Sequence, residues 1–160
     1  METIIVVGNG MVGYKFCEKL IERSKSLNYR IIVFGEERRP AYDRVHLSAY
    51  FENGDASSLE MSPRSWYEDN GIKLISNERV IDINRDLKEI VTETKGNFAY
   101  DYLVLATGSA PFVPPIDGVD KKGVFVYRTI EDLDGMLTYA EALKKENKAP
   151  KAAVLGGGLL

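Results

Sequence analysis

The chain has 160 residues, of which 44% are apolar and 28% are charged, and its formal net charge is −3. This composition is typical of a globular protein and excludes the strongly basic surface of a nucleic-acid-binding domain. Apolar runs stay short of the ~20 residues of a transmembrane helix, and no signal peptide follows Met1, so we expect a cytoplasmic protein with no membrane partner. The single cysteine, Cys17, excludes an intramolecular disulfide and a dithiol redox centre.

The first predicted element is a buried strand that leads into a glycine-rich loop. Residues 3–7 end in four β-branched apolar residues, and residues 8–13 match G-x-G-x-x-G. In this motif the first glycine allows a tight turn, the second lets the backbone approach a pyrophosphate, and the third lets the next helix pack closely with its N–H groups directed at the anion. The loop residues expected to bind a dinucleotide are Gly8, Asn9, Gly10, Met11, Val12 and Gly13.

The helix that this loop opens has an apolar stripe. Val12, Phe16 and Leu20 recur at helical spacing, and Cys17 and Ile21 widen the stripe. We expect this face to pack on the sheet, with Cys17 as a structural thiol rather than a reactive one.

An acidic residue follows the second predicted strand, residues 29–34. Glu36 comes 23 residues after Gly13, close to the spacing at which a carboxylate accepts the hydroxyl groups of an adenosine ribose. Gly35 and Glu37 flank Glu36 and are assigned to the same site. The strand before the loop, the helix after it and the acid beyond it together predict a dinucleotide-binding βαβ unit, which is more specific than the glycines alone.

The middle of the chain is predicted to hold short helices and a meander. Residues 45–51 are compatible with a short helix, and a second helix begins with Ser62 as its cap and Pro63 at its first position, ending at residues 70–71. Three short strands follow, and their tight turns make them antiparallel. Their approximate bounds are residues 78–83, 89–93 and 98–100. A buried strand of the parallel type at residues 102–106 comes next.

A proline-rich linker precedes the last predicted elements. Residues 111–118 contain three prolines and indicate a boundary between domains or subdomains. A short strand is expected at residues 123–127 and a helix at residues 130–145. Thr129 is the predicted cap of this helix, with Asp132 in the capping-box position.

A second glycine-rich segment follows one more predicted strand, residues 151–155. Gly156 and Gly158 match the start of another G-x-G-x-x-G, so we expect the front portion of a longer protein. The predicted fold is α/β: a Rossmann-type parallel sheet with a three-stranded antiparallel meander, truncated at the start of a second Rossmann unit. The expected domains are residues 1–112 and an incomplete 113–160. The unfinished strand at the sheet edge predicts self-association into a homo-oligomer.

Other candidate residues favour structural roles. His46 is the only histidine and reads as a loop residue, because the spacing offers it no partners for a metal site or a nucleophilic pair. Trp66 and Tyr67 are expected to pack. We find no general acid, nucleophile or set of metal ligands and therefore assign no catalytic residue, which is consistent with chemistry carried by a redox cofactor.

The order of these motifs resembles that of the FAD-dependent pyridine-nucleotide reductases. In that family the first Rossmann fold binds FAD, an A-T-G-[ST] segment closes over the FAD phosphates, and a second glycine-rich loop binds NAD(P)H. Longer strings resemble the large subunits of NAD(P)H-dependent nitrite reductases. These strings are residues 7–13, 34–51 (FGEERRPAYDRVHLSAYF), 102–116 (YLVLATGSAPFVPPI) and 123–133 (GVFVYRTIEDL).

The resemblance implies cofactor roles for further residues. At FAD these are Ala106, Thr107 and Gly108 near the phosphates, Arg44, Leu47 and Ser48 along the pyrophosphate and ribityl chain, and the backbone of Val80 by the adenine. At NAD(P)H they are Gly156 and Gly158. The role of Arg44 is chemically reasonable, because a guanidinium binds a phosphate bidentately.

The resemblance also implies an activity. The whole enzyme would pass hydride from NAD(P)H to FAD, and then electrons through iron–sulfur and sirohaem centres to nitrite. This chain has no cysteine cluster to hold those centres, so they are assigned to the remaining domains of the parent, and the piece alone is not expected to reduce nitrite. A small subunit is a further implied partner.

Two alternatives stay open. One is an electron-transfer protein like the ferredoxin and rubredoxin reductases, which often continue the string as L-S-K; here Ala49 stands at the lysine position and favours the nitrite reductase pattern. The other is a non-catalytic nucleotide-binding fragment. NADH oxidases and CoA-disulfide reductases place a redox cysteine near this region, and the absence of any cysteine after Cys17 argues against that chemistry.

Overall fold

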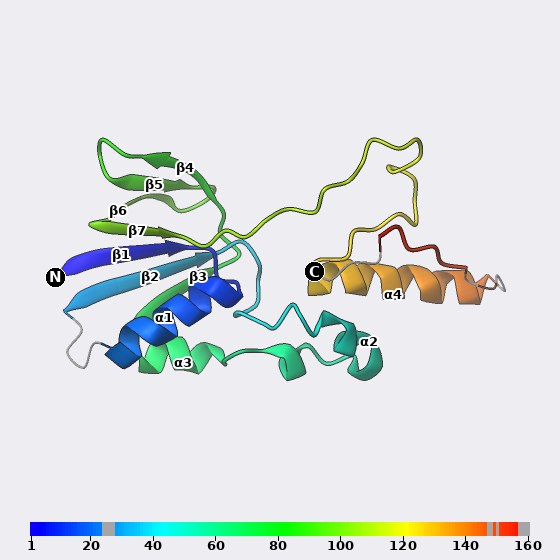
Figure 1. The fold of residues 1–160 in the computed structure, drawn as a ribbon, viewed down its shortest axis with the longest axis horizontal. Coiled ribbons are helices and arrows are strands. Elements are labelled where there is room, and N and C mark those ends of the chain that lie inside the picture. The colour runs from blue at the N-terminus through cyan, green and yellow to red at the C-terminus, as the bar shows by residue number, and fades with distance from the viewer. Residues whose placement is uncertain (24–27, 147–148, 150, 157–160) are drawn as a thin grey trace. The chain divides into compact units, whose positions relative to one another are not determined.

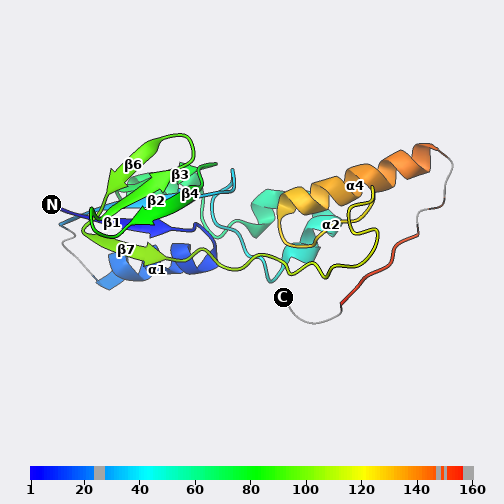
Figure 2. The same ribbon diagram turned by 90° about the horizontal axis from the view of Figure 1, so that it is seen from above.

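A computed structural model describes residues 1–23, 28–146, 149 and 151–156 of the chain. The chain divides into two compact units (Figures 1 and 2). The first unit contains Met1–Asp43 and Glu60–Ser109, and the second contains Arg44–Leu59 and Ala110–Leu160. The domain boundary predicted after residue 112 falls inside the second unit and stays a prediction about the whole protein.

A four-stranded parallel sheet forms the centre of the first unit. Its strands lie in the order β3-β2-β1-β7, and their bounds are β1 Glu2–Val7, β2 Tyr29–Gly35, β3 Ile72–Ser76 and β7 Tyr102–Leu105. In register, Ile4 pairs with Ile31 on one side and with Tyr102 on the other. β1 is central and buried along its last four residues, which explains its uninterrupted β-branched sequence, because a strand covered on both faces has no polar side.

Two helices, α1 (Met11–Arg23) and α3 (Arg64–Asp69), lie on one face of this sheet (Figure 1). The even-numbered residues of β1, Ile4 and Val6, face a buried cluster that includes Cys17 of α1 and Tyr67 of α3. This alternation is the period of two that a β-strand imposes on its side chains. The helices therefore bury one set of the β1 side chains.

The predicted meander is confirmed and covers the opposite face. It is an antiparallel sheet in the order β4-β5-β6, with bounds Val80–Asn84, Glu89–Thr92 and Gly96–Ala99. Ile5 and Val7 of β1 join a second buried cluster with Ile90 of β5. The rings of Phe34 and Phe98 meet edge to face, with centroids 5.0 Å apart. The α/β class, with its parallel sheet and separate meander, is as predicted.

The second unit is built around α4 (Ile130–Lys145), whose predicted bounds are confirmed. The Thr129 side chain accepts a hydrogen bond from the backbone N–H of Asp132, and the Asp132 carboxylate accepts one from the N–H of Thr129, so the predicted capping box is present. Three short helical turns precede it in sequence: η1 (Leu47–Ala49), α2 (Tyr50–Asn53) and η2 (Ala56–Leu59). The Tyr50 hydroxyl donates to Asp134 of α4 at 2.5 Å, which ties α2 to α4. Among the described residues, no helix is long and apolar enough to cross a membrane.

Two predicted strands are wrong. Residues 123–127 form turns and irregular chain, and Phe125 of this segment packs its ring against Tyr139 of α4 at 5.7 Å. Its apolar residues are therefore used for packing on a helix instead of a sheet. Residues 151–155 are irregular and exposed, and they have no strand partner in the part of the chain that the structure describes. An apolar run forms a strand only where another strand satisfies its backbone groups.

Three further details differ from the sequence predictions. The cap of α3 is Pro63 and not Ser62, and it makes no side-chain capping bond. β3 was missed, because it follows Gly71 directly and has only five residues. α1 buries Gly13, Tyr14 and Cys17, whereas Val12 is 70% exposed. The missing side chain of Gly13 brings this side of the helix closest to the sheet, so Val12 is turned away.

Candidate dinucleotide-binding site

The glycine-rich loop lies at the carboxyl ends of three neighbouring parallel strands. Gly8 directly follows β1, and its N–H donates to the carbonyl of Phe34 in β2 at 2.8 Å. The N–H of Ala106, just after β7, donates to the carbonyl of Val7 at 2.8 Å. Three predicted segments, the loop, the end of β2 and the A-T-G segment, therefore meet at one sheet edge. Ligands of open α/β sheets bind at this edge.

Two glycines of the loop are required by contacts with the backbone. Gly8 has φ +109°, and a Cβ built there would lie 2.2 Å from the carbonyl oxygen of Ala106. A Cβ on Gly13 would lie 2.0 Å from the carbonyl oxygen of Gly8. No real Cβ makes contacts this short, so any larger residue displaces the backbone. The tight turn and the close helix approach predicted for these glycines are both present.

Gly10 differs from its two neighbours, because a Cβ built on it meets no atom within 4 Å. The space above its backbone is open and fits a ligand that approaches the main chain. α1 begins at Met11 and has no acidic residue in its first turn. Because the first N–H groups of a helix lack partners within the helix and carry partial positive charge, this end of α1 suits a phosphate group.

Glu36 projects from the end of β2 with an exposed side chain, and its Oε1 lies 3.9 Å from Nε of Arg79. The preceding Gly35 is close to the loop: a Cβ built there would lie 3.1 Å from Cβ of Asn9. The N–H of Glu78 donates to the carbonyl of Gly35 at 3.0 Å, which brings the chain before β4 to the same edge. The structure therefore places the strand-end acid beside the segment that leads to Val80. Arg79 was not assigned from the sequence, where no motif singles it out.

Glu37 and Asn9 are both held by tyrosine hydroxyls. Tyr42 donates to the Glu37 carboxylate at 2.7 Å, and Tyr67 of α3 donates to Oδ1 of Asn9 at 2.9 Å. Nδ2 of Asn9 is buried and has no hydrogen-bond partner among the described residues. Tyr67 was predicted only to pack, since 58 residues separate it from Asn9 and no local pattern links the two.

Three further predicted FAD residues, Arg44, Leu47 and Ser48, belong to the second unit, whereas Thr107 and Gly108 directly follow Ala106 in the first unit. Arg44 donates from Nη1 to the carbonyl of Arg128 at 2.9 Å, Ser48 Oγ lies 3.0 Å from the Tyr127 hydroxyl, and Leu47 is buried. These contacts join the segment before η1 to the segment that leads into α4. Two glycines are assigned to NAD(P)H by the resemblance. Gly156 has φ +99° and is exposed, and Gly158 lies outside the described residues.

Burial and hydrogen bonding shift the pKa values of several groups in the first unit. Burial raises the pKa of the Cys17 thiol to about 12, which keeps it protonated and unreactive. Burial also raises the pKa of Tyr67 to about 12. Glu78 is only 2% exposed and accepts hydrogen bonds from Thr94 and Lys95, and these bonds lower its pKa to about 2. No cluster of metal-ligating side chains occurs within the described residues.

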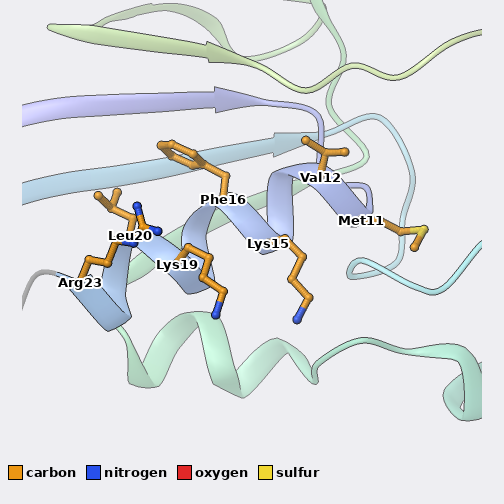
Figure 3. Close-up of a pocket in the computed structure, with 7 residues that line it drawn as sticks. All are labelled: Met11, Val12, Lys15, Phe16, Lys19, Leu20 and Arg23. Carbon is orange, nitrogen blue, oxygen red and sulfur yellow. The ribbon is translucent and has the colours of Figure 1, made fainter.

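A groove of about 570 Å³ runs along the exposed side of α1 (Figure 3). Its apolar lining comes from Met11, Val12, Phe16 and Leu20, and its polar rim from Lys15, Lys19 and Arg23. Only Met11 and Val12 are shared with the glycine-rich loop. The groove therefore begins at the end of the glycine-rich loop and continues along α1.

Comparison with known proteins assigns the chain to a family. The family model for pyridine nucleotide-disulphide oxidoreductases matches residues 2–160. The chain belongs to this family. It is 46% identical over 157 residues to the NADH nitrite reductase large subunit of Escherichia coli (strain K12), an alignment that covers 98% of this chain and 18% of the relative. It is 37% identical over 161 residues to the assimilatory nitrate reductase electron transfer subunit of Bacillus subtilis (strain 168), covering 99% and 20%.

Solved structures agree with this assignment. The ferredoxin reductase for the CYP199A2 system of Rhodopseudomonas palustris superposes with a TM-score of 0.79 at 26% identity, covering 90% of this chain and 35% of that one. A reduced Bacillus anthracis CoADR-RHD gives the same TM-score at 24% identity, over 89% of this chain and 27% of that one, and shows the shared fold. The chain spans only 18% of the Escherichia coli nitrite reductase large subunit and 19% of a nitrite reductase of Bacillus subtilis (strain 168) that it also matches.

Proposed function

We propose that this chain is the FAD-binding front part of an NAD(P)H-dependent nitrite reductase large subunit. The observation that carries the FAD assignment is the loop geometry: Gly8 and Gly13 are fixed by backbone contacts, while Gly10 leaves open space beside the first turn of α1. The activity is supported by the similarity to nitrite reductases, among them the Escherichia coli large subunit at 46% identity.

The described residues fit a dinucleotide on physical grounds. The backbone around Gly10 and the N-terminus of α1 would hold the diphosphate, since both offer N–H donors to an anion and no acidic side chain opposes it there. The exposed carboxylate of Glu36 would accept the ribose hydroxyls. Thr107 and Gly108 follow Ala106, whose carbonyl closes over Gly8, and would complete the phosphate side of the site.

Bound FAD would supply the redox chemistry by accepting hydride from NAD(P)H and releasing electrons one at a time. The protein's own contribution is to bind and orient. Arg44 would provide a cation for the diphosphate, and the carbonyl of Arg128 positions its guanidinium. Leu47, Ser48 and Val80 are proposed as further contacts along FAD, and Gly156 and Gly158 as part of the NAD(P)H site. No side chain of this chain is assigned as a catalytic acid, base or nucleophile.

The other parts of the activity belong to the whole protein. We propose that iron–sulfur and sirohaem centres, a small subunit and the site of nitrite reduction lie outside this chain, which has a single buried cysteine. A cytoplasmic location and self-association are proposed with them. A reductase for ferredoxin or rubredoxin is the second candidate function, favoured by the likeness to the Rhodopseudomonas palustris enzyme. Steady-state assays of the whole protein with NADH and either nitrite or ferredoxin as acceptor distinguish the two.

A flavin titration tests the binding proposal directly. FAD is added to residues 1–160, and quenching of flavin fluorescence is followed to saturation. A Cβ on Gly10 meets no protein atom within 4 Å, and in Gly10→Asp the new negative charge would lie beside the proposed diphosphate, so we expect binding about 100-fold weaker. Gly156→Asp adds the same charge at another open glycine and is expected to leave FAD binding unchanged. Equal binding by the wild type and Gly10→Asp would contradict the proposal.

A further inference from the structure

A side-chain hydrogen bond connects the glycine-rich loop to α3. The hydroxyl of Tyr67 donates to Oδ1 of Asn9 at 2.9 Å. Tyr67 also packs in one buried cluster with Ala41, whose carbonyl accepts the N–H of Met61 at 2.9 Å. Asn9 and Tyr67 thus link two segments that are 58 residues apart in sequence.

The bond uses the acceptor end of the Asn9 amide. The Tyr67 hydroxyl has one proton to donate, and the Asn9 carbonyl oxygen Oδ1 accepts it. This contact orients the side-chain amide and leaves Nδ2 as the buried group without a hydrogen-bond partner among the described residues.

The hydrogen bond from Tyr67 to the Asn9 amide, here called the tether, holds the one side chain between two glycines of the turn. Asn9 lies between Gly8 and Gly10, and glycine backbones are the least restricted of all residues. Its Cβ also lies against Gly35 at the end of β2. A fixed Asn9 therefore restricts the backbone on both of its sides, and on the Gly10 side that backbone is the open surface of the loop.

We propose that Tyr67 is a positioning residue for the nucleotide diphosphate site. By holding the Asn9 amide, its hydroxyl keeps the Gly10 backbone in the conformation that receives a diphosphate. This inference rests on the proposed function, because the diphosphate is the ligand for which the loop is held. Because Tyr67 is fully buried, it acts through Asn9 and not by direct contact with the diphosphate.

The structure offers a matched control in Tyr14. Its ring is also buried and lies 6.4 Å from that of Tyr67 in the same aromatic group. The Tyr14 hydroxyl, however, donates to Glu18 on its own helix at 3.2 Å and has no link to the loop. Tyr14→Phe removes a hydroxyl from the same cluster, whereas Tyr67→Phe removes the one that reaches Asn9.

The test uses residues 1–160 with two readouts. The first is amide hydrogen exchange, by NMR and without nucleotide, at Gly8 and Tyr14, whose backbone hydrogen bonds of 2.8 and 3.0 Å flank the loop. The second is ADP affinity by calorimetry. We expect Tyr67→Phe to raise both exchange rates about tenfold and to weaken ADP binding about three- to tenfold, because Asn9 Oδ1 loses the hydroxyl that donates to it. Tyr14→Phe is expected to change neither quantity.

Each outcome decides the proposal. If Tyr67→Phe matches Tyr14→Phe in both readouts, the tyrosine only packs and the proposal is overturned. If Tyr67→Phe does not fold, Asn9→Ala carries the same test, since it removes the tether without touching the aromatic rings. If the wild type binds no ADP, the proposed function fails, and faster exchange in Tyr67→Phe alone still supports the tether. Adding Asn9→Ala to Tyr67→Phe should cause no further loss, because both remove one interaction.

Discussion

The chain contains two strand–glycine sequences that look alike in the sequence and differ in the structure. Gly8 and Gly156 both have positive φ angles, +109° and +99°. Around Gly8, the carbonyl of Ala106 lies where a Cβ would be, whereas nothing lies within 4 Å of the corresponding position at Gly156. β1 before Gly8 is paired on both sides, and the described residues before Gly156 are exposed and unpaired. Glycines thus define a site only where neighbouring strands pack against them.

The largest expected effect is on stability at the first of these glycines. Gly8→Ala forces a Cβ to within 2.2 Å of the Ala106 carbonyl at a left-handed φ. We expect a loss of roughly 3 kcal/mol in the free energy of unfolding, measured by urea denaturation. Gly156→Ala meets no atoms and should lose much less. Similar losses in both variants would mean that the two segments are equally packed.

The packed unit also depends on a buried carboxylate, which gives its stability a pH dependence. Hydrogen bonds from Thr94 and Lys95 lower the pKa of Glu78 from its ordinary 4.5 to about 2. Because the pKa is lower in the folded state, the unfolded chain binds more protons within this window. The stabilisation that the Glu78 carboxylate contributes is therefore fully present above pH 4.5 and is lost as the pH falls towards 2. Glu78→Gln should flatten this part of the curve in thermal melts between pH 2 and 6, and an unchanged slope would contradict the assignment.

A ligand-binding test examines Glu36, the acidic residue that follows β2 beside the first glycine-rich loop. Glu36→Ala should weaken ADP binding about tenfold, because the carboxylate would accept the ribose hydroxyls. Calorimetry with 2′-deoxy-ADP separates this from a general effect: the wild type should prefer ADP, and the variant should lose most of that preference. A variant that keeps the full preference would show that another group reads the ribose.

The smallest expected change concerns the second unit. Thr129→Ala removes the side-chain half of the capping box and should lower the stability of α4 by about 1 kcal/mol. Thermal unfolding followed by circular dichroism measures the change, and Thr129→Ser, which keeps the hydroxyl, is the control.

The sequence predicted those features that depend on neighbouring residues. The loop glycines, the β1–α1–β2 order, the meander and the capping box of α4 are local patterns, and the structure confirms them. β3 was missed because its five residues show no clear boundary after Gly71. The apolar run at residues 123–127 predicts a strand, because the sequence does not reveal that Phe125 packs on Tyr139. The bond from Tyr67 to Asn9 depends on tertiary packing and has no signal in spacing.

The buried thiol of Cys17 can be used to measure how often α1 separates from the sheet of the first unit. The residue is fully buried on α1, and its pKa of about 12 leaves almost no thiolate at neutral pH. A disulfide reagent should therefore react only with molecules in which α1 has separated from the sheet. Since the chain contains no other cysteine, each labelled molecule records one such event. The labelling rate of the unmodified protein would give the rate at which α1, the helix that begins at the glycine-rich loop, separates from the sheet. A bound nucleotide should lower this labelling rate.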